Sequence, residues 1–167
     1  MKTKHEVIDN FLSKDDFERL KNIVMNPLTA YFFQSDVNDN HKDEDLSIYF
    51  THSLFNQKDD AIYSNLYHNF SHIFWETLNI KSLIRMKLNC YPRTDTLKVH
   101  KAHQDYPFSH KACIYSFNTC DGSTVLEDGT KIKSVANRAL LFDAYTHHSS
   151  TTTTDVKARF NVNINYF

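Results

Sequence analysis

Two segments in the second half of the sequence, 84–91 and 159–166, alternate apolar and polar side chains with a period of two. Successive side chains of a β-strand point to opposite faces of a sheet, so each segment predicts a strand with one apolar and one polar face. The apolar faces carry Ile84, Met86, Leu88 and Cys90, and Phe160, Val162, Ile164 and Tyr166. The polar faces carry Arg85, Lys87, Asn89 and Tyr91, and Arg159, Asn161, Asn163 and Asn165. The fold must therefore cover one side of this sheet and leave the other to line a cleft.

Two predicted helices would bury the apolar face of this sheet. Ser13 follows a short strand predicted over 7–11 and can cap a helix that closes at Pro27. A longer amphipathic helix is predicted over 59–78, where apolar residues recur at helical spacing: Ile62, Leu66, Phe70, Ile73, Phe74 and Leu78. Between the helices, 28–58 predicts two short strands or a lid around a polar run.

These patterns favour an α+β, mostly β fold, namely a double-stranded β-helix (jelly roll) with helices packed on one face of the major sheet. With 167 residues and 41% hydrophobic content, the chain suits a single domain over 1–167. Residues 1–80 would supply a strand, the helices and the lid region. Residues 81–167 would form the jelly-roll core that carries the site.

Composition excludes several classes of function. A formal net charge of -1 predicts no nucleic-acid partner. With only two glycines, the chain cannot build a glycine-rich phosphate loop or dinucleotide fingerprint. No apolar run reaches membrane-spanning length, and neither a signal-peptide pattern nor a disulfide framework appears among the three cysteines. We therefore expect a cytoplasmic protein without a membrane association.

The triplet His103-Gln104-Asp105 is the main candidate for chemistry. On an extended segment, His103 and Asp105 point to the same side and can reach one metal ion. A third ligand would follow the buried strand predicted over 138–143, where either His147 or His148 is available. Two histidines and one carboxylate are the ligand set of non-haem Fe(II) oxygenases.

Arg159 lies eleven residues after His148, which allows a turn and a return along a neighbouring strand. Its guanidinium could then hold a carboxylate bidentately at the inner end of the cleft. A solvated arginine on an edge strand is the alternative interpretation. The order of the three candidate ligands and the arginine along the chain favours the interpretation in which Arg159 lies in the cleft.

The remaining histidines and cysteines are better explained without a metal. His68 and His72 are four residues apart on the polar side of the predicted helix, but HNFSH lacks the glutamate of a zinc-binding HExxH motif. His100 and His110 flank the triplet and are expected in loops or beside the site. Cys113 and Cys120 are expected to be a core thiol and a turn thiol, because no basic residue is patterned to activate either one.

The C-terminal half, about 82–167, resembles the prolyl 4-hydroxylase branch of the Fe(II) and 2-oxoglutarate dependent dioxygenases. The segments that carry the resemblance are NCYP at 89–92, HQD at 103–105, CIY at 113–115, NTCDG at 118–122, NRALLFD at 137–143, HSS at 148–150 and RFN at 159–161. The opening segment VIDNFLSKDDFERL is similar to the strand and helix that begin many of these domains.

The resemblance implies a role for each residue that matches the pattern. His103, Asp105 and His148 would hold Fe(II), and 2-oxoglutarate would bind the iron while Arg159 pairs with its C5 carboxylate. O2 would complete the reaction, which hydroxylates a substrate, with a prolyl residue of a protein or peptide as one candidate. The further cosubstrate-binding candidates are Tyr91, Tyr115, Ser116 and Asn161. No catalytic residue beyond the metal centre is implied.

One departure from the family concerns Ser116, which stands where relatives carry a second tyrosine for the C5 carboxylate. That contact would be lost or taken over by Tyr115. Retention of Asp105 favours hydroxylation over halogenation, because related halogenases replace this carboxylate with a small residue. Two alternatives remain open: a cupin-like metal-binding module without oxygenase turnover, and a structural protein that kept the fold. The identity of the substrate, whether protein, peptide or small molecule, is left open.

Overall fold

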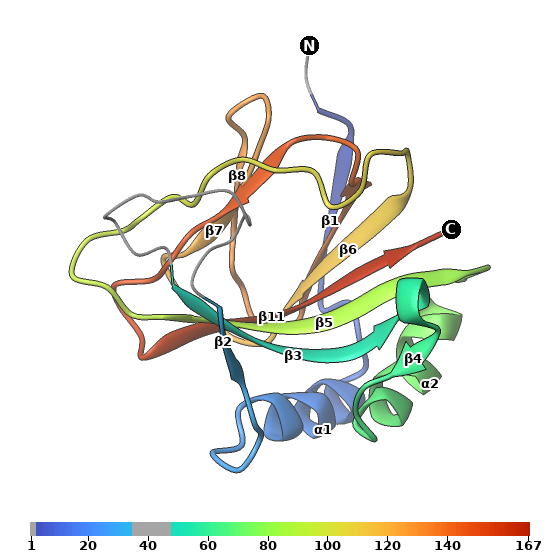
Figure 1. The fold of residues 1–167 in the computed structure, drawn as a ribbon. Helices are drawn as coiled ribbons and strands as arrows, with labels where there is room; N and C mark the ends of the chain where they lie inside the picture. Colours follow the sequence, from blue (N-terminus) through green and yellow to red (C-terminus); the bar gives the residue numbers. More distant parts are fainter. Residues whose placement is uncertain (1–2, 35–47) are drawn as a thin grey trace.

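The computed structural model describes residues 3–34 and 48–167, and within them it contains two antiparallel sheets and two α-helices. The larger, eight-stranded sheet has the order β1-β9-β6-β11-β5-β3-β2, with β4 paired to β3, and the smaller has the order β10-β7-β8. This mostly β architecture with helices on one face of the large sheet confirms the predicted fold class (Figure 1). The strands of the large sheet are β1 (His5–Asp9), β2 (Phe32–Gln34), β3 (Tyr49–Asn56), β4 (Ala61–Ile62), β5 (Leu83–Pro92), β6 (Lys111–Ser116), β9 (Arg138–Asp143) and β11 (Ala158–Tyr166).

The remaining elements are α1 (Lys14–Val24), the 3-10 turn η1 (Gln57–Asp59), α2 (Tyr67–Thr77), β7 (Ser123–Leu126), β8 (Lys131–Lys133) and β10 (His148–Ser150). Figure 1 shows α1 and α2 together on the side of β3, β5 and β11 that lies away from the smaller sheet. No helix in the described ranges is both long and apolar enough to cross a membrane.

The predicted alternation of β5 and β11 is confirmed, and their pairing aligns the two faces. Val162 lies opposite Leu88 and Ile164 opposite Met86, so the apolar side chains form one surface. This surface packs against α1 and α2 in the main core, to which the helices contribute Phe17, Leu20, Val24, Phe70, Ile73 and Phe74. The polar side chains are aligned on the other face, which leaves them available for a cleft.

The sequence signals at Ser13 and Pro27 correctly predicted the location of α1. The Ser13 hydroxyl accepts a hydrogen bond from the Asp16 backbone N–H at 3.2 Å, as expected of a helix cap. The helix ends at Val24, three residues before Pro27. The strand predicted over 7–11 is shifted to His5–Asp9, because its pairing with β9 sets its bounds.

The helix predicted over 59–78 is wrong before residue 67, where α2 begins. Residues 57–62 form η1 and then β4, in which Ile62 lies opposite Phe55 of β3. Asp60 takes a left-handed conformation (φ 45°) that ends the 3-10 turn. Strand pairing here overrides the helical spacing, and Ile62 is half exposed instead of packed on a helix face. The two short strands predicted in 28–58 are β2 and β3, whereas the polar run of that region lies outside the described residues.

Candidate metal centre and cosubstrate cleft

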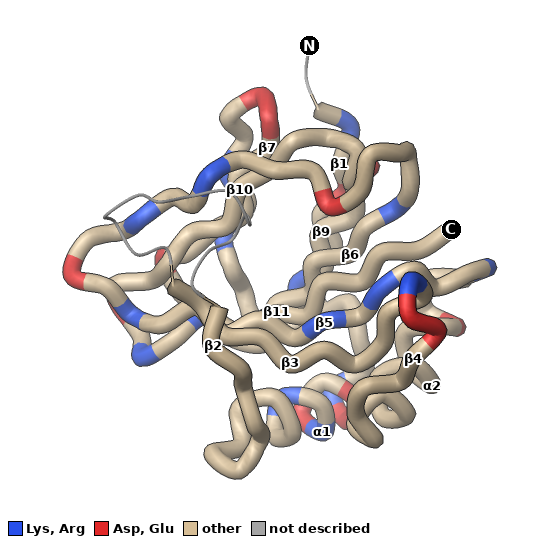
Figure 2. The backbone as a smooth tube through the Cα atoms, in the orientation of Figure 1, with Lys and Arg blue, Asp and Glu red and all other residues tan. Residues whose placement is uncertain are grey.

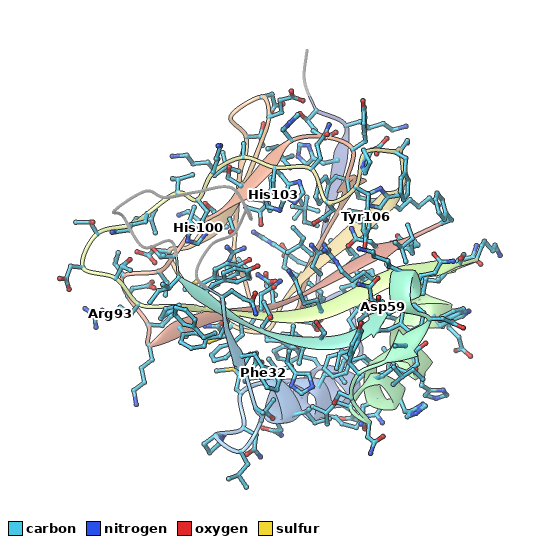
Figure 3. All side chains as sticks on the ribbon, viewed as in Figure 1. Phe32, Asp59, Arg93, His100, His103 and Tyr106 are labelled. Carbon is cyan, nitrogen blue, oxygen red and sulfur yellow. The ribbon has the colours of Figure 1, made fainter. Side chains whose placement is uncertain are left out.

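Three side chains with metal-ligating atoms converge on the face of the large sheet opposite the helices. His103 and His148 pair through two backbone hydrogen bonds with N–O distances of 3.0 and 2.9 Å. Asp105 lies two positions after His103, and one ligand atom from each of the three residues lies within 4.8 Å of the other two. Figure 3 shows His103 on the segment that crosses over this face. The arrangement could hold one metal ion from one side.

The structure distinguishes between the two candidate histidines. His148 is buried, and its Nδ1 lies 3.1 Å from the Thr146 carbonyl oxygen. A proton on Nδ1 can donate to that carbonyl, which leaves Nε2 as an acceptor 3.9 Å from Asp105 Oδ2. His147 points away, with its side chain 49% exposed and its Nδ1 3.8 Å from Glu127 Oε1. Only His148 is therefore placed to join His103 and Asp105.

The Asp105 carboxylate is buried and held on both oxygens. Arg85 Nη2 donates to Oδ1 at 2.6 Å, and the amides of Asn163 and Asn165 donate to Oδ2 at 3.1 and 2.9 Å. Burial by itself would raise the pKa of Asp105, but the positive charge of Arg85 and these amide donors outweigh it and hold the pKa well below its ordinary value. The carboxylate is thus ionised and oriented for a cation.

His103 is suited to metal binding by its protonation state. Burial, followed by the neighbouring His148, lowers the pKa of His103 to about 4. The ring is therefore neutral near pH 7, and a neutral imidazole is the form that ligates a metal.

A polar cavity of about 290 Å³ extends from these three residues to Arg159. Arg159 is only 1% exposed, and its Cζ lies 5.3 Å from the ring centroid of Tyr91. Its Nη1 donates to the carbonyls of Ser123 and Thr151 at 2.9 and 3.2 Å, whereas its Nε has no hydrogen-bond partner among the described residues. No described carboxylate forms an ion pair with it. A buried guanidinium without an anion can bind the carboxylate of a ligand.

Comparison with known proteins rests on structure alone, because no family model and no curated protein sequence matches the chain. A prolyl hydroxylase from Trichoplax adhaerens, solved with a fragment of hypoxia inducible factor, matches with a TM-score of 0.71 and 16% identity over 98% of this chain and 83% of that one. The viral collagen prolyl hydroxylase of Paramecium bursaria Chlorella virus-1, solved with 2-oxoglutarate, matches with a TM-score of 0.60 and 14% identity over 96% and 94% of the two chains.

This chain has the fold of the 2-oxoglutarate and Fe(II) dependent oxygenases. The fold does not determine the reaction. A non-haem α-ketoglutarate dependent epimerase from nogalamycin biosynthesis matches with a TM-score of 0.66 and 8% identity over 99% of this chain and 78% of that one. Roles for this chain must therefore come from its own residues.

Within this oxygenase fold, Tyr91 and Asn161 lie where the sequence predicted, on the polar side of the sheet. Both line the cavity. Tyr91 stacks between Tyr49 and His100, with ring centroids 5.5 Å from each. Asn161 Oδ1 accepts a hydrogen bond from the Asn89 amide at 2.8 Å. Tyr49 and Tyr91 of this stack line the cavity, and Tyr91 lies against Arg159.

The prediction for Tyr115 is wrong. Its ring lies in the core that faces the helices, and its hydroxyl donates to Asn137 Oδ1 at 2.7 Å. Alternation along β6 explains this placement, because Tyr115 pairs with the core residue Val162, whereas Ser116 pairs with Asn161. Ser116 is buried on the cleft side of the strand but does not line the cavity, which Ile114 reaches instead. Neither Tyr115 nor Ser116 lines the cavity.

His68, His72, His110 and Cys113 lie as their sequence interpretations suggested, and Cys120, which was expected to be a turn thiol, is buried. His68 and His72 are exposed on α2. His110 lies beside the site, with its Nε2 3.1 Å from the Asn165 amide that holds Asp105. Cys113 belongs to the main core.

Three features of the site were not predicted. Arg85 and Lys87 were assigned only to a polar strand face, although both line the cavity beside the candidate ligands. Figure 2 shows basic positions on β5, in the middle of the large sheet. Gly122 was noted only as the end of the NTCDG segment, but an added Cβ would lie 2.8 Å from Arg159 Cδ and 2.6 Å from the Thr152 carbonyl oxygen. The sequence signal that could have pointed to Gly122 is that the chain contains only two glycines.

Proposed function

We propose that this protein is an oxygenase that couples the oxidative decarboxylation of 2-oxoglutarate to the hydroxylation of a substrate. One observation carries the proposal: the ligand atoms of His103, Asp105 and His148 meet in the same cavity that ends at the buried guanidinium of Arg159. A carboxylate and two imidazoles suit Fe(II), and a buried arginine suits the far carboxylate of a keto acid.

Each residue has a defined role in this proposal. His103, Asp105 and His148 would hold the metal, with Asp105 oriented by Arg85, Asn163 and Asn165. Arg159 would bind the C5 carboxylate, and the Tyr91 ring would cover the guanidinium.

When bound, iron and 2-oxoglutarate would supply the oxygen activation and the electrons, while the chain supplies orientation and a shielded cavity.

A prolyl residue of a protein or peptide is the first substrate to test, because the similar structures include prolyl hydroxylases. A small molecule is the second candidate substrate. The alternative function is a metal-binding jelly-roll or cupin-like module without turnover, acting through the same three ligands.

The proposal is tested by measuring succinate formed from 2-oxoglutarate in the presence of Fe(II) and air. We expect turnover by the unaltered protein and by His147→Ala, and loss of both turnover and bound iron in His103→Ala. Iron binding without turnover would favour the metal-binding alternative. Absence of both iron binding and turnover in the unaltered protein would rule out the proposal.

A further inference from the structure

Lys87 lies in the cavity without an assigned role. It is on β5 between Arg85, which holds Asp105, and Asn89, and it lies opposite Asn163 of β11. Its Nζ lies 5.5 Å from the ring centroid of Tyr49. Within the described ranges, no carboxylate is within ion-pair distance of this ammonium. Burial and the neighbouring charge of Arg85 lower the pKa of Lys87 to about 7, so the cost of burying this ammonium is relieved either by loss of its proton or by binding of an anion.

The net charge of the cavity also favours an anionic ligand. Its described lining residues include Arg85, Lys87, Arg159 and the single carboxylate of Asp105, which leaves an excess of one positive charge when Lys87 is neutral and of two when it is protonated. A bound Fe(II) dication and a bound 2-oxoglutarate dianion would cancel each other. The excess therefore persists in the loaded site, and an anionic substrate would reduce it.

Two buried acceptors lie beside Lys87 and have no hydrogen-bond partner among the described residues: Asn89 Oδ1 and Asn163 Oδ1. Ionised 2-oxoglutarate carries only acceptors, so it cannot satisfy them. A second molecule with an N–H or O–H group can. The cavity of about 290 Å³ must also hold the cosubstrate, so only a small part of that second molecule can enter it.

We propose that Lys87 is a specificity residue that binds a carboxylate of the substrate. The substrate portion that enters the cavity is then the size of an amino acid, with a carboxylate on Lys87 and a hydrogen-bond donor directed to Asn89 and Asn163. The inference rests on the proposed function, because it takes the Arg159 end of the cavity to be filled by 2-oxoglutarate.

The test is equilibrium binding, without turnover, to the protein loaded with Fe(II) and saturating 2-oxoglutarate under nitrogen. The probes are matched pairs that differ by one carboxylate: L-proline and L-prolinamide, N-acetyl-L-aspartate and N-acetyl-L-asparagine, and N-acetyl-L-glutamate and N-acetyl-L-glutamine. Binding of Fe(II) and 2-oxoglutarate is titrated first and tests the proposed function separately. The variants are Lys87→Met, which keeps the length of the side chain, and Lys131→Met on exposed β8 as the control.

We expect at least one carboxylate probe to bind about tenfold more tightly than its amide. Lys87→Met should bring that ratio close to one, and Lys131→Met should leave it unchanged. Equal binding of both members of every pair, or no binding by any probe, would overturn the inference. It would also be overturned if Lys87→Met weakened 2-oxoglutarate binding about tenfold and left the probe ratio intact, because Lys87 would then serve the cosubstrate.

Discussion

Arg85 Nη2 lies 2.6 Å from Asp105 Oδ1, so the carboxylate of the candidate metal centre is already paired with a cation. The same carboxylate also accepts two amide hydrogen bonds on Oδ2. Arg85 thus stabilises the buried carboxylate without a metal, but its charge would repel a dication bound there. The two amides can keep the carboxylate oriented when Arg85 is removed.

Arg85→Gln should therefore unfold at a lower temperature than the unaltered protein without metal, and should bind Fe(II) more tightly, by on the order of tenfold. Thermal unfolding with and without Fe(II) under nitrogen measures both effects. Arg138→Gln, which removes an ion pair with exposed Asp9, is the control and should leave the metal-induced shift unchanged. Weaker metal binding by Arg85→Gln would contradict the prediction and would mean that the amides of Asn163 and Asn165 cannot hold the carboxylate in place without Arg85.

Replacement of the two adjacent histidines should separate their roles. His148→Ala removes a buried ring whose Nε2 lies 3.9 Å from Asp105 Oδ2, whereas His147→Ala removes a half-exposed ring. We expect His148→Ala to lose most of its bound iron and His147→Ala to keep it, as measured by metal analysis after anaerobic loading. Equal iron retention by the two variants would place the third ligand elsewhere.

Arg159→Met should weaken 2-oxoglutarate binding by about a hundredfold or more, because the far carboxylate would lose a buried partner. Fe(II) binding should change much less. Arg159→Lys should be intermediate, since it keeps the charge but lacks the planar donor pattern. Calorimetric titration of 2-oxoglutarate and of Fe(II) into each variant measures both affinities. A larger loss of Fe(II) binding than of 2-oxoglutarate binding would contradict the assignment of Arg159 to the cosubstrate.

Gly122→Ala should disturb the same end of the cavity without removing a polar group. The new Cβ would lie 2.8 Å from Arg159 Cδ and 2.6 Å from the backbone oxygen of Thr152, so the arginine or the backbone must shift. We expect weaker 2-oxoglutarate binding with little change in Fe(II) binding. Gly129→Ala is the matched control, because its added Cβ meets nothing within 4 Å, although its φ of +82° also strains an alanine. Equal effects of both substitutions on 2-oxoglutarate binding would contradict a steric role for Gly122.

A carboxylate in the turn between β7 and β8, Asp128, should contribute to acid sensitivity. The backbone N–H of Thr3 and the hydroxyl and N–H of Thr130 lower the pKa of Asp128 from 3.8 to about 2. Because the folded pKa lies below the unfolded one, the contribution to stability is complete above pH 3.8 and is lost as the pH falls through about 2. Urea unfolding between pH 5 and 2 should show a smaller pH dependence for Asp128→Asn than for the unaltered protein. Parallel pH profiles for the two proteins would contradict this role.

Much of the fold could be predicted from signals between chain neighbours. The cap at Ser13 depends on a residue three positions away, and the faces of β5 and β11 follow from alternation within each strand. The same alternation placed Tyr91, Asn161 and Arg159 on the cleft side. The short spacing of His103 and Asp105 was enough to propose that both reach one ion.

The sequence by itself therefore determined the jelly-roll class, the polar strand face and the composition of the candidate ligand set. Only the tertiary structure decided that His148 and not His147 faces Asp105, that Tyr115 belongs to the core, and that 57–62 returns to β3. It also brought Arg85 to Asp105, twenty residues away, and set Gly122 against Arg159. The physical reason is that these contacts depend on strand register and on the packing of distant segments, where a shift of one residue exchanges the two faces of a strand.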